Sequence, residues 1–386
     1  MQSKHVFHRN ELAEKIAKRV LLPTPGSASS SGLFLSAPRR TGKSTFIRED
    51  LRPVLLAAGT IVIYIDLWAD KKADPGRVII SAIRSELAKY EGVIKRLAKS
   101  AGMDKVNVGG MSFSIDRVGL DQDISLSGAL AALSDEKKKP IVLIIDEAQH
   151  AITTSDGSDT LFSLKAARDE LNSSLHHGLH IIATGSNQAK LAMLRSSKDQ
   201  AFFGAHLLNF PPLGQPYIDW FCHNLEFGNH LDPLEVMALF KKSAFRPEIL
   251  GAAAEALRDD FELKDEDVAK RFSEEVLVQI ESSNNELLRV IQGLTPIQFA
   301  VLKVLAESGE EYAPFVAETL ARYMDVLEEI KAGADVKADV TSVQQALIAL
   351  QEKFLVWKAS RGVYSVEDTA ITELFDAGLI SKRPRT

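Results

Sequence analysis

The chain has 386 residues, of which 45% are hydrophobic and 25% are charged. These values are typical of globular proteins, so they exclude a disordered chain, and the length predicts two or three domains. The formal net charge of -6 gives the whole chain no electrostatic attraction to nucleic acid. A single cysteine, Cys222, excludes an internal disulfide and a cysteine-rich zinc site. No apolar segment is long enough for a signal peptide or a membrane span, so we expect a cytoplasmic protein.

An amphipathic helix is predicted near the N-terminus, because Leu12, Ile16 and Val20 recur at helical spacing. The stretch 23–31 is rich in Pro, Gly and Ser, and it separates this helix from an apolar strand at residues 32–35. Another helix is predicted to begin after the loop that follows. This order of strand, loop and helix is the context in which a phosphate-binding loop is found.

That loop, residues 36–45, reads SAPRRTGKST and is similar to the phosphate-binding pattern G-x-x-x-x-G-K-[ST]. Ala37 replaces the first glycine, whereas Gly42, Lys43 and Ser44 match the pattern. Backbone amides of such a loop surround a phosphate, the lysine reaches the β- and γ-phosphates, and the serine hydroxyl binds Mg²⁺. The alternative is a lysine-containing loop that matches the pattern by chance.

The next segments alternate between strand and helix. A strand at 60–67 and a helix at 78–90 indicate a parallel sheet, and a helix is also predicted at 126–133. Between residues 91 and 122 the pattern changes to alternation around two glycines. This predicts an inserted β-hairpin whose apolar positions are Val106, Val108, Phe113 and Ile115.

Residues 141–147 form an apolar run that ends in two carboxylates, Asp146 and Glu147. Taken alone, the run is a strand and its turn. Together with the upstream loop it reads as a Walker B element, in which Asp146 holds Mg²⁺ and Glu147 polarises the attacking water. The two segments together predict a nucleotide site at the carboxyl edge of the sheet.

Another buried strand is predicted at 180–187, and it ends in the polar residues Ser186 and Asn187. If this strand lies beside the Walker B strand, either side chain reaches the γ-phosphate or the attacking water. Capping of the following helix is an equally good interpretation.

Strand patterns stop near residue 210, and residues 217–280 have a helical, acidic pattern. Pro247 begins a helix within this region, which places Arg246 at its entrance. An exposed arginine at such a position is usually only solvated.

The last hundred residues read as a separate unit. Thr295 and Pro296 match the cap and first position of a helix, and further helices are predicted at 312–331 and 341–353. Two short strands, residues 354–358 and 363–366, follow as a hairpin. Helices followed by a hairpin predict a winged helix.

With these motifs in sequence order, the chain resembles the AAA+/STAND P-loop ATPases. It is most similar to the archaeal-type ATPase family, and more loosely to transposition and secretion ATPases that also carry a D-E-A-Q sequence. Phe7, Arg9, Glu11 and Leu12 match the box that precedes the P-loop in that family. The resemblance implies an α/β P-loop NTPase with a parallel sheet, a helical lid and a C-terminal winged helix. The expected domains are 1–212, 213–285 and 286–386.

The resemblance also implies roles for particular residues. Mg²⁺ is expected at Ser44 and Asp146. The other expected catalytic residues are Glu147, Lys43, the γ-phosphate sensors Ser186 or Asn187, and a second sensor, Arg246. Where relatives carry an arginine finger after Phe-x-Gly, this chain has Ala205, which leaves Arg195 as the candidate. The expected nucleotide-binding residues are Phe7, Arg9, Pro38, Arg39, Arg40, Thr41, Gly42, Lys43, Ser44, Thr45 and Arg246.

The leading hypothesis is an ATPase that binds ATP and Mg²⁺ and acts as a nucleotide-driven conformational switch. The alternatives are a nucleotide-gated scaffold or signalling module with negligible turnover, and an ATP-dependent DNA-binding regulator. The expected partner is a protein or a second copy of the chain. DNA is less favoured, because the predicted recognition helix 341–353 has almost no basic residues.

Overall fold

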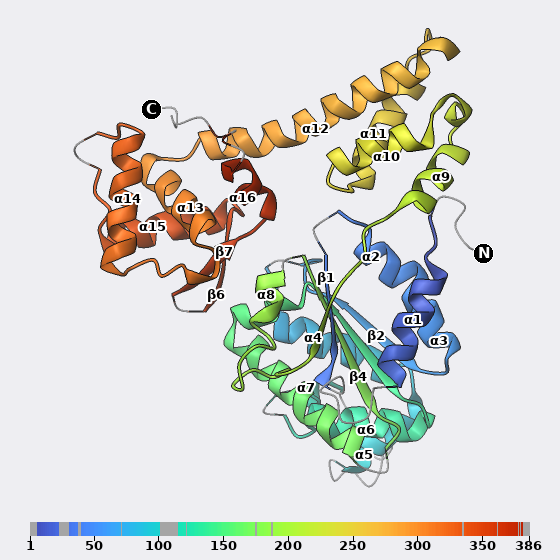
Figure 1. Cartoon of the computed structure of the whole chain (residues 1–386). Coiled ribbons are helices and arrows are strands. Elements are labelled where there is room, and N and C mark those ends of the chain that lie inside the picture. Colours follow the sequence, from blue (N-terminus) through green and yellow to red (C-terminus); the bar gives the residue numbers. More distant parts are fainter. Residues whose placement is uncertain are drawn as a thin grey trace. The chain divides into compact units, whose positions relative to one another are not determined.

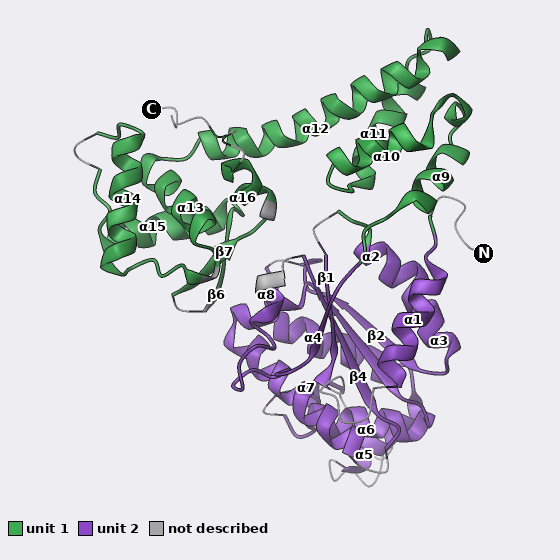
Figure 2. Cartoon of the chain, viewed as in Figure 1, with its two compact units in different colours: residues 1–7, 38–42, 211–386 green, residues 8–37, 43–210 purple. Residues whose placement is uncertain are grey.

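The computed structural model describes residues 6–22, 31–37, 40–70, 72–100, 115–120, 122–173, 176–186, 188–333, 336–360, 362–376, 378 and 380. Contact clustering divides the chain into two compact units (Figure 2). We call residues 8–37 and 43–210 the core unit, and residues 1–7, 38–42 and 211–386 the helical unit. In the described ranges, no helix combines the length and apolar character that a membrane crossing requires.

The core unit is built on a parallel five-stranded sheet with the order β2-β3-β4-β1-β5 (Figure 1). Its strands are β1 (Leu33–Ser36), β2 (Ile61–Asp66), β3 (Ile141–Asp146), β4 (Leu179–Gly185) and β5 (His206–Asn209). All residues of β3 are buried, as expected where both faces of a sheet are covered. The sequence pattern predicted the first four strands but not β5, which is a short edge strand without a fully buried residue.

Helices cover both faces of this sheet, because alternate side chains of each strand point to opposite sides. Leu143 and Ile145 belong to the larger hydrophobic cluster, which includes residues of α4 (Pro75–Leu87), α5 (Glu91–Ser100), α6 (Leu126–Lys137) and α7 (Ser155–Ser173). Val142 and Ile144 pack in a second cluster with α1 (Asn10–Leu21) and the helix after the P-loop. Figure 1 shows α1 and α3 on one side of the sheet and α4 and α7 on the other.

The helix after the P-loop contains a π-helical turn. It runs as α2 (Lys43–Phe46), the π-turn (Ile47–Leu51) and α3 (Arg52–Ala57). Asp50 in this turn is 2% exposed and accepts hydrogen bonds from His8 Nδ1 (2.7 Å) and the backbone nitrogen of Arg9 (3.0 Å). The buried carboxylate of Asp50 therefore connects the P-loop helix to the segment that precedes α1 through two hydrogen bonds.

The segment 91–122, in which the hairpin is predicted, has a helix and a 3₁₀ turn in its described parts. Residues 91–100 form α5, because Val93 and Leu97 are spaced for one helical face and are buried there. Ile115 begins a single 3₁₀ turn. The other three predicted positions, Val106, Val108 and Phe113, lie outside the described residues.

The helical unit contains two hydrophobic cores. The first gathers the helices α9 (Gln215–His223), α10 (Pro233–Lys242), α11 (Pro247–Arg258) and the start of α12 (Val268–Gln292). The second gathers α13 (Pro296–Ser308), α14 (Ala317–Glu329), α15 (Val340–Glu352), the hairpin β6 (Val356–Ser360) and β7 (Val363–Val366), and α16 (Thr369–Asp376). The predicted fold class is confirmed, whereas the three domain boundaries stay a prediction.

Ile144 of β3 tests the sheet core, since it is fully buried in the hydrophobic cluster that includes the P-loop helix. Ile144→Ala should lower the melting temperature of the core transition by roughly 5–15 °C, because it removes buried methylene groups and leaves a cavity. Differential scanning calorimetry measures this shift. Leu56→Ala, at a side chain that is 48% exposed, is the control and should change the temperature little; equal shifts would contradict the placement.

Candidate functional site

The candidate site is built around Asp146, the last residue of β3, which is 2% exposed. Its Oδ2 accepts hydrogen bonds from Ser44 Oγ (2.7 Å) and from Tyr64 Oη (3.1 Å), and Oδ1 accepts one from Thr184 Oγ1. Tyr64, Asp146 and Thr184 come from three adjacent strands and meet at the carboxyl edge of the sheet, where ligands bind in open α/β folds.

Lys43 brings a buried positive charge to this edge. Its ammonium lies 3.6 Å from Asp146 Oδ1 and donates a hydrogen bond to Glu147 Oε1 at 3.1 Å. Gly42, the residue before it, has a φ of +82°, a conformation that glycine adopts without strain. Lys43 is 5% exposed, so it is stabilised by these carboxylates rather than by water.

Glu147 follows β3 with a left-handed backbone (φ 55°, ψ 44°), which is unusual for a residue other than glycine. Besides Lys43, its carboxylate accepts hydrogen bonds from Gln149 Nε2 (2.6 Å) and Ser186 Oγ (2.9 Å), both on Oε2. Burial raises the pKa of Glu147, but the charge of Lys43 and the three hydrogen bonds outweigh burial and lower it to about 2. The carboxylate of Glu147 is therefore ionised, and both of its oxygens accept hydrogen bonds.

The donor set fits Mg²⁺. Ser44 and Asp146 supply oxygen atoms 2.7 Å apart, and Mg²⁺ in phosphate sites is bound by one or two protein oxygens, with phosphate and water completing its shell. The described part of the chain contains no group of three or more His, Cys, Asp or Glu side chains placed for a metal.

Three residues of this cluster were missed by sequence reasoning: Tyr64, Thr184 and Gln149. Tyr64 and Thr184 lie in predicted strands, but their contact with Asp146 depends on strand order and register. Gln149 belongs to the D-E-A-Q sequence, which was a signal for the family and not for a contact.

Of the other residues predicted for the site, two lie in the described part of the P-loop segment and three lie outside the described residues. Thr45 lies in α2, and Thr41 is buried. Pro38, Arg39 and Asn187 lie outside the described residues, so the choice between Ser186 and Asn187 as a sensor stays open.

The box before α1 is divided between the two units. In the core unit, the guanidinium of Arg9 lies 4.8 Å from the ring centre of Phe210, and burial lowers the pKa of Arg9 although Asp50 opposes that shift. In the helical unit, the ring of Phe7 lies 5.6 Å from that of Tyr217 and 5.8 Å from that of Trp220.

Within the helical unit, both arginines of interest contact residues of their own unit. Arg40 lies 4.0 Å from Glu248 of α11. Arg246, the residue before α11, donates hydrogen bonds to the Ser243 carbonyl and to Ser283 Oγ, each at 2.9 Å. These contacts hold Arg246 to the start of α11 and to α12.

Arg195 lies at the opposite edge of the sheet from Asp146. It donates a hydrogen bond to the backbone carbonyl of Ala205, directly before β5 begins, whereas Asp146 ends its strand. In its own chain it therefore does not join the cluster. A finger acting on a second copy remains a prediction.

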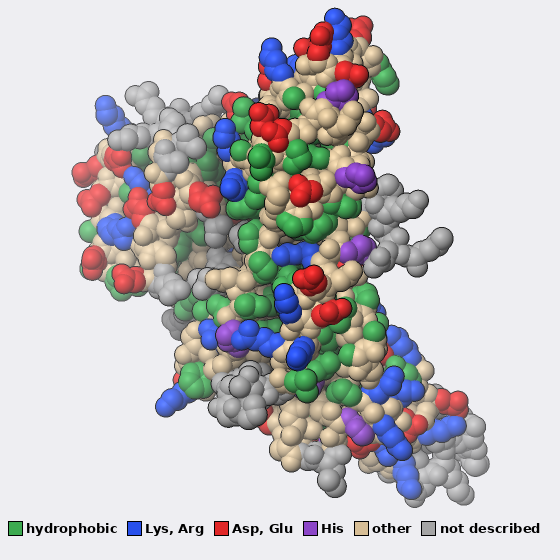
Figure 3. All heavy atoms as spheres, turned by 45° about the vertical axis from the view of Figure 1, so that its right-hand side comes forward, with side chains coloured by type: hydrophobic (Ala, Val, Ile, Leu, Met, Phe, Trp, Pro, Cys, Tyr) green, Lys and Arg blue, Asp and Glu red, His purple; other side chains and the backbone are tan. Residues whose placement is uncertain are grey.

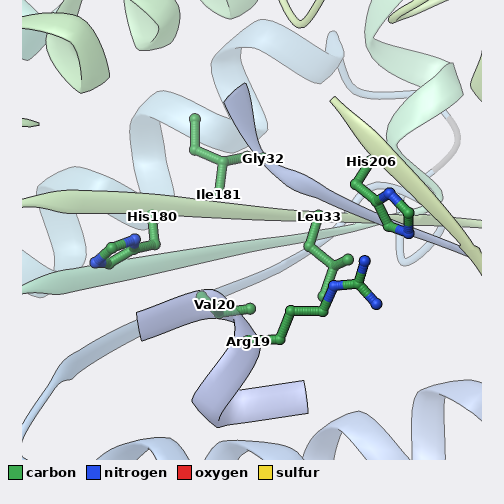
Figure 4. A pocket seen from close by; sticks show the side chains of 7 residues that line it. All are labelled: Arg19, Val20, Gly32, Leu33, His180, Ile181 and His206. Carbon is green, nitrogen blue, oxygen red and sulfur yellow. The ribbon is translucent and has the colours of Figure 1, made fainter. Parts of the chain in front are cut away.

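A small pocket also lies at that opposite edge, among the first residues of β1, β4 and β5 (Figure 4). Figure 4 shows the guanidinium of Arg19 on the same side as the imidazole of His206. Burial lowers the pKa of His206, and the charges of Arg19 and Arg195 lower it further. The other lining residues are Val20, Gly32, Leu33, His180 and Ile181. This pocket is separate from the carboxylate cluster.

Comparison with known proteins gives a fold without a sequence family. No family model and no curated protein matches the chain. Among solved structures, the Walker-type ATPase PABY2304 of Pyrococcus abyssi has a TM-score of 0.51 and 16% identity, and the match covers 96% of each chain. The Aeropyrum pernix ORC2 protein in its ADP form has a TM-score of 0.53 and 16% identity, over 99% of this chain and 97% of that one. These likenesses confirm the predicted P-loop ATPase fold.

Lys43→Met tests the electrostatics of the cluster without nucleotide. The pKa of Glu147 is depressed in the folded protein, so this group stabilises the fold above its ordinary pKa near 4.5 and loses that effect as the pH falls toward 2. Without Lys43 the largest effect that lowers this pKa is lost, so Lys43→Met should melt below the wild type at pH 7, by a margin that shrinks between about pH 4.5 and 2. Calorimetry from pH 2 to 7 measures this. The control is Lys15→Met, which removes an exposed ion pair with Glu11 and should change the melting temperature little. A difference in melting temperature between Lys43→Met and the wild type that stays constant from pH 7 to 2 would contradict the pairing of Lys43 with Glu147.

Proposed function

We propose that the chain binds ATP with Mg²⁺ at the cluster of Lys43, Ser44, Asp146 and Glu147, and hydrolyses it. The observation that carries this proposal is the buried ammonium of Lys43, which faces two carboxylates and is followed by the Ser44 hydroxyl at the carboxyl edge of a parallel sheet. A fold shared with ATPases supports it. A chance lysine loop would have no reason to meet the Walker B carboxylates across 104 residues of sequence.

Each side chain has a role in this proposal. Lys43 binds the β- and γ-phosphates, and Ser44 and Asp146 hold Mg²⁺, which supplies positive charge against the triphosphate. Glu147 acts as general base toward the attacking water. Phosphate oxygens compete with Glu147 for Lys43, so nucleotide binding removes the main cause of the low pKa of Glu147 and makes this carboxylate a stronger base.

The remaining predicted residues keep supporting roles. Ser186 or Asn187 senses the γ-phosphate, and Arg246 acts as the second sensor. For Arg246 this role requires release of its charge-assisted hydrogen bond to Ser283 Oγ. Arg195 is the candidate that acts on a second copy of the chain.

We further propose that ATP turnover drives a conformational switch. The rival scaffold or signalling module would bind ATP through the same residues but hydrolyse it too slowly to matter. Steady-state turnover of the purified chain separates the two, since the switch needs repeated hydrolysis and the scaffold needs only occupancy.

For the winged helix we favour a protein partner over DNA. Residues 286–386, including the basic tail, carry eleven Lys and Arg against fifteen Asp and Glu, a net charge of -4. The exposed face of α15 includes Gln344, Gln345 and Ile348, which bring no positive charge. Figure 3 shows acidic and basic side chains interspersed, with no continuous basic surface in that view. DNA affinity depends on neutralising phosphates, so this charge balance disfavours the regulator alternative.

Glu147→Gln tests the proposed base. The variant keeps the shape of the side chain but removes the carboxylate, so hydrolysis should slow by about a hundredfold or more while ATP still binds. Single-turnover hydrolysis and calorimetric titration measure the two effects. Lys43→Ala is the matched variant for binding and should abolish or greatly weaken ATP affinity. Normal hydrolysis by Glu147→Gln would reduce this residue to a strand-end carboxylate.

A second prediction concerns DNA. In fluorescence anisotropy at near-physiological salt, the full chain should bind duplex DNA only in the nonspecific range, with Kd values of roughly 1–100 µM and a steep salt dependence. Two unrelated duplexes of equal length serve as controls for each other. Tight, sequence-selective binding would establish the regulator alternative instead.

A further inference from the structure

Gln149 is a fully buried polar residue that the proposed reaction does not use. It lies in the 3₁₀ turn Ala148–Thr153 after β3 and is 0% exposed. Its Nε2 donates to Glu147 Oε2 at 2.6 Å, and its Oε1 is buried without a hydrogen-bond partner in the described part of the chain. A buried amide with an unsatisfied oxygen is destabilising, so its retention needs an explanation.

The orientation of this amide is set by the charge it faces. Turning the amide over would place its oxygen against the carboxylate, which is electrostatically unfavourable. Gly185 leaves room for the amide because it has no side chain. A Cβ at this position would lie only 2.5 Å from Gln149 Oε1. The last residue of β4 is therefore a glycine at the point where the amide approaches most closely.

The contacts of Glu147 divide between its two oxygens. Oε1 faces Lys43, while Oε2 accepts from Gln149 and Ser186. Once phosphates attract Lys43, only the bonds to Oε2 still fix the carboxylate. The left-handed backbone of Glu147 sets where its side chain begins but leaves the side-chain torsions free to rotate. The direction of Oε1 therefore depends on Gln149 and Ser186, which donate to Oε2.

We propose that Gln149 is a positioning residue, which holds Glu147 by its Oε2 so that Oε1 stays directed at the place Lys43 vacates. The catalytic consequence of this inference rests on the proposed function. The hydrogen bond between Gln149 and Glu147 is independent of that function. Ser186 is the second support and brings the end of β4 into the same arrangement.

Two near-isosteric variants separate positioning from simple packing. Gln149→Met keeps the volume but donates nothing, so Glu147 loses a hydrogen bond on Oε2 and keeps the one from Ser186. Gln149→Glu places a second carboxyl beside Glu147, and the two share a proton. This variant should therefore support turnover at low pH, where the new carboxyl is protonated and donates, and lose it as the pH rises.

The first measurement needs no activity. Crystal structures of Lys43→Met and of the double variant Lys43→Met/Gln149→Met show where the Glu147 carboxylate lies once Lys43 no longer faces Oε1. The proposal expects the carboxylate in its wild-type position in Lys43→Met and in the control Lys43→Met/Gln344→Met, which changes an exposed glutamine of α15, and displaced in Lys43→Met/Gln149→Met. An undisplaced carboxylate in Lys43→Met/Gln149→Met would overturn the proposal whether or not the chain is an ATPase.

The second measurement is the pH profile of ATP turnover. Gln149→Met should lower kcat about tenfold or more, with the affinity for ATP within twofold of wild type and the acid limb moved to higher pH. The ATP turnover of Gln149→Glu should fall as the pH rises, whereas that of the wild type should rise as Glu147 ionises. Wild-type profiles in both variants would overturn the positioning role. If Glu147→Gln hydrolyses ATP normally, the role of Glu147 as the base fails, whereas a wild-type chain without ATP turnover would overturn the proposed function. In both cases the position of the carboxylate still decides whether Gln149 holds Glu147.

Discussion

The ion pair of Lys43 with the two carboxylates after β3 is the interaction on which the rest of the site depends. An ammonium group that is 5% exposed is tolerated only where opposite charges and hydrogen bonds replace water. Asp146 and Glu147 provide the charge, and hydroxyl and amide groups from β2, β4 and the following turn satisfy the carboxylates in turn. Both carboxylates are hydrogen-bonded internally without a ligand, so a phosphate that attracts Lys43 must replace existing contacts.

In the proposed function, that replacement links ATP binding to ATP hydrolysis. Lys43 holds the pKa of Glu147 low while the site is without nucleotide, which makes the carboxylate a weak base when there is nothing to hydrolyse. Attraction of Lys43 to phosphate relieves this effect. The same lysine would thus contribute twice, to affinity through the phosphates and to reactivity through its departure from Glu147.

The helical unit is organised by its own contacts. Arg246 is bound at the start of α11 and to α12, and the second core of the unit encloses the hairpin and the helices around it. The acidic balance of this last region contrasts with what a winged helix on DNA requires. Shared fold therefore does not decide the partner, which depends on the charges on the surface.

The sequence by itself determined the strands and helices that carry chemistry, because apolar runs, a glycine-lysine loop and a pair of terminal carboxylates are local signals. It predicted Lys43, Ser44, Asp146 and Glu147, and the structure brings these four together. It missed the helix at residues 91–100, where Val93 and Leu97 have helical spacing, and it missed β5, whose apolar run is only Leu207 and Leu208. Only the tertiary structure decided that Tyr64, Thr184 and Gln149 contact the carboxylates. Those contacts depend on strand order, register and a turn after β3, and these arise from packing between segments far apart in the chain, which no local pattern encodes.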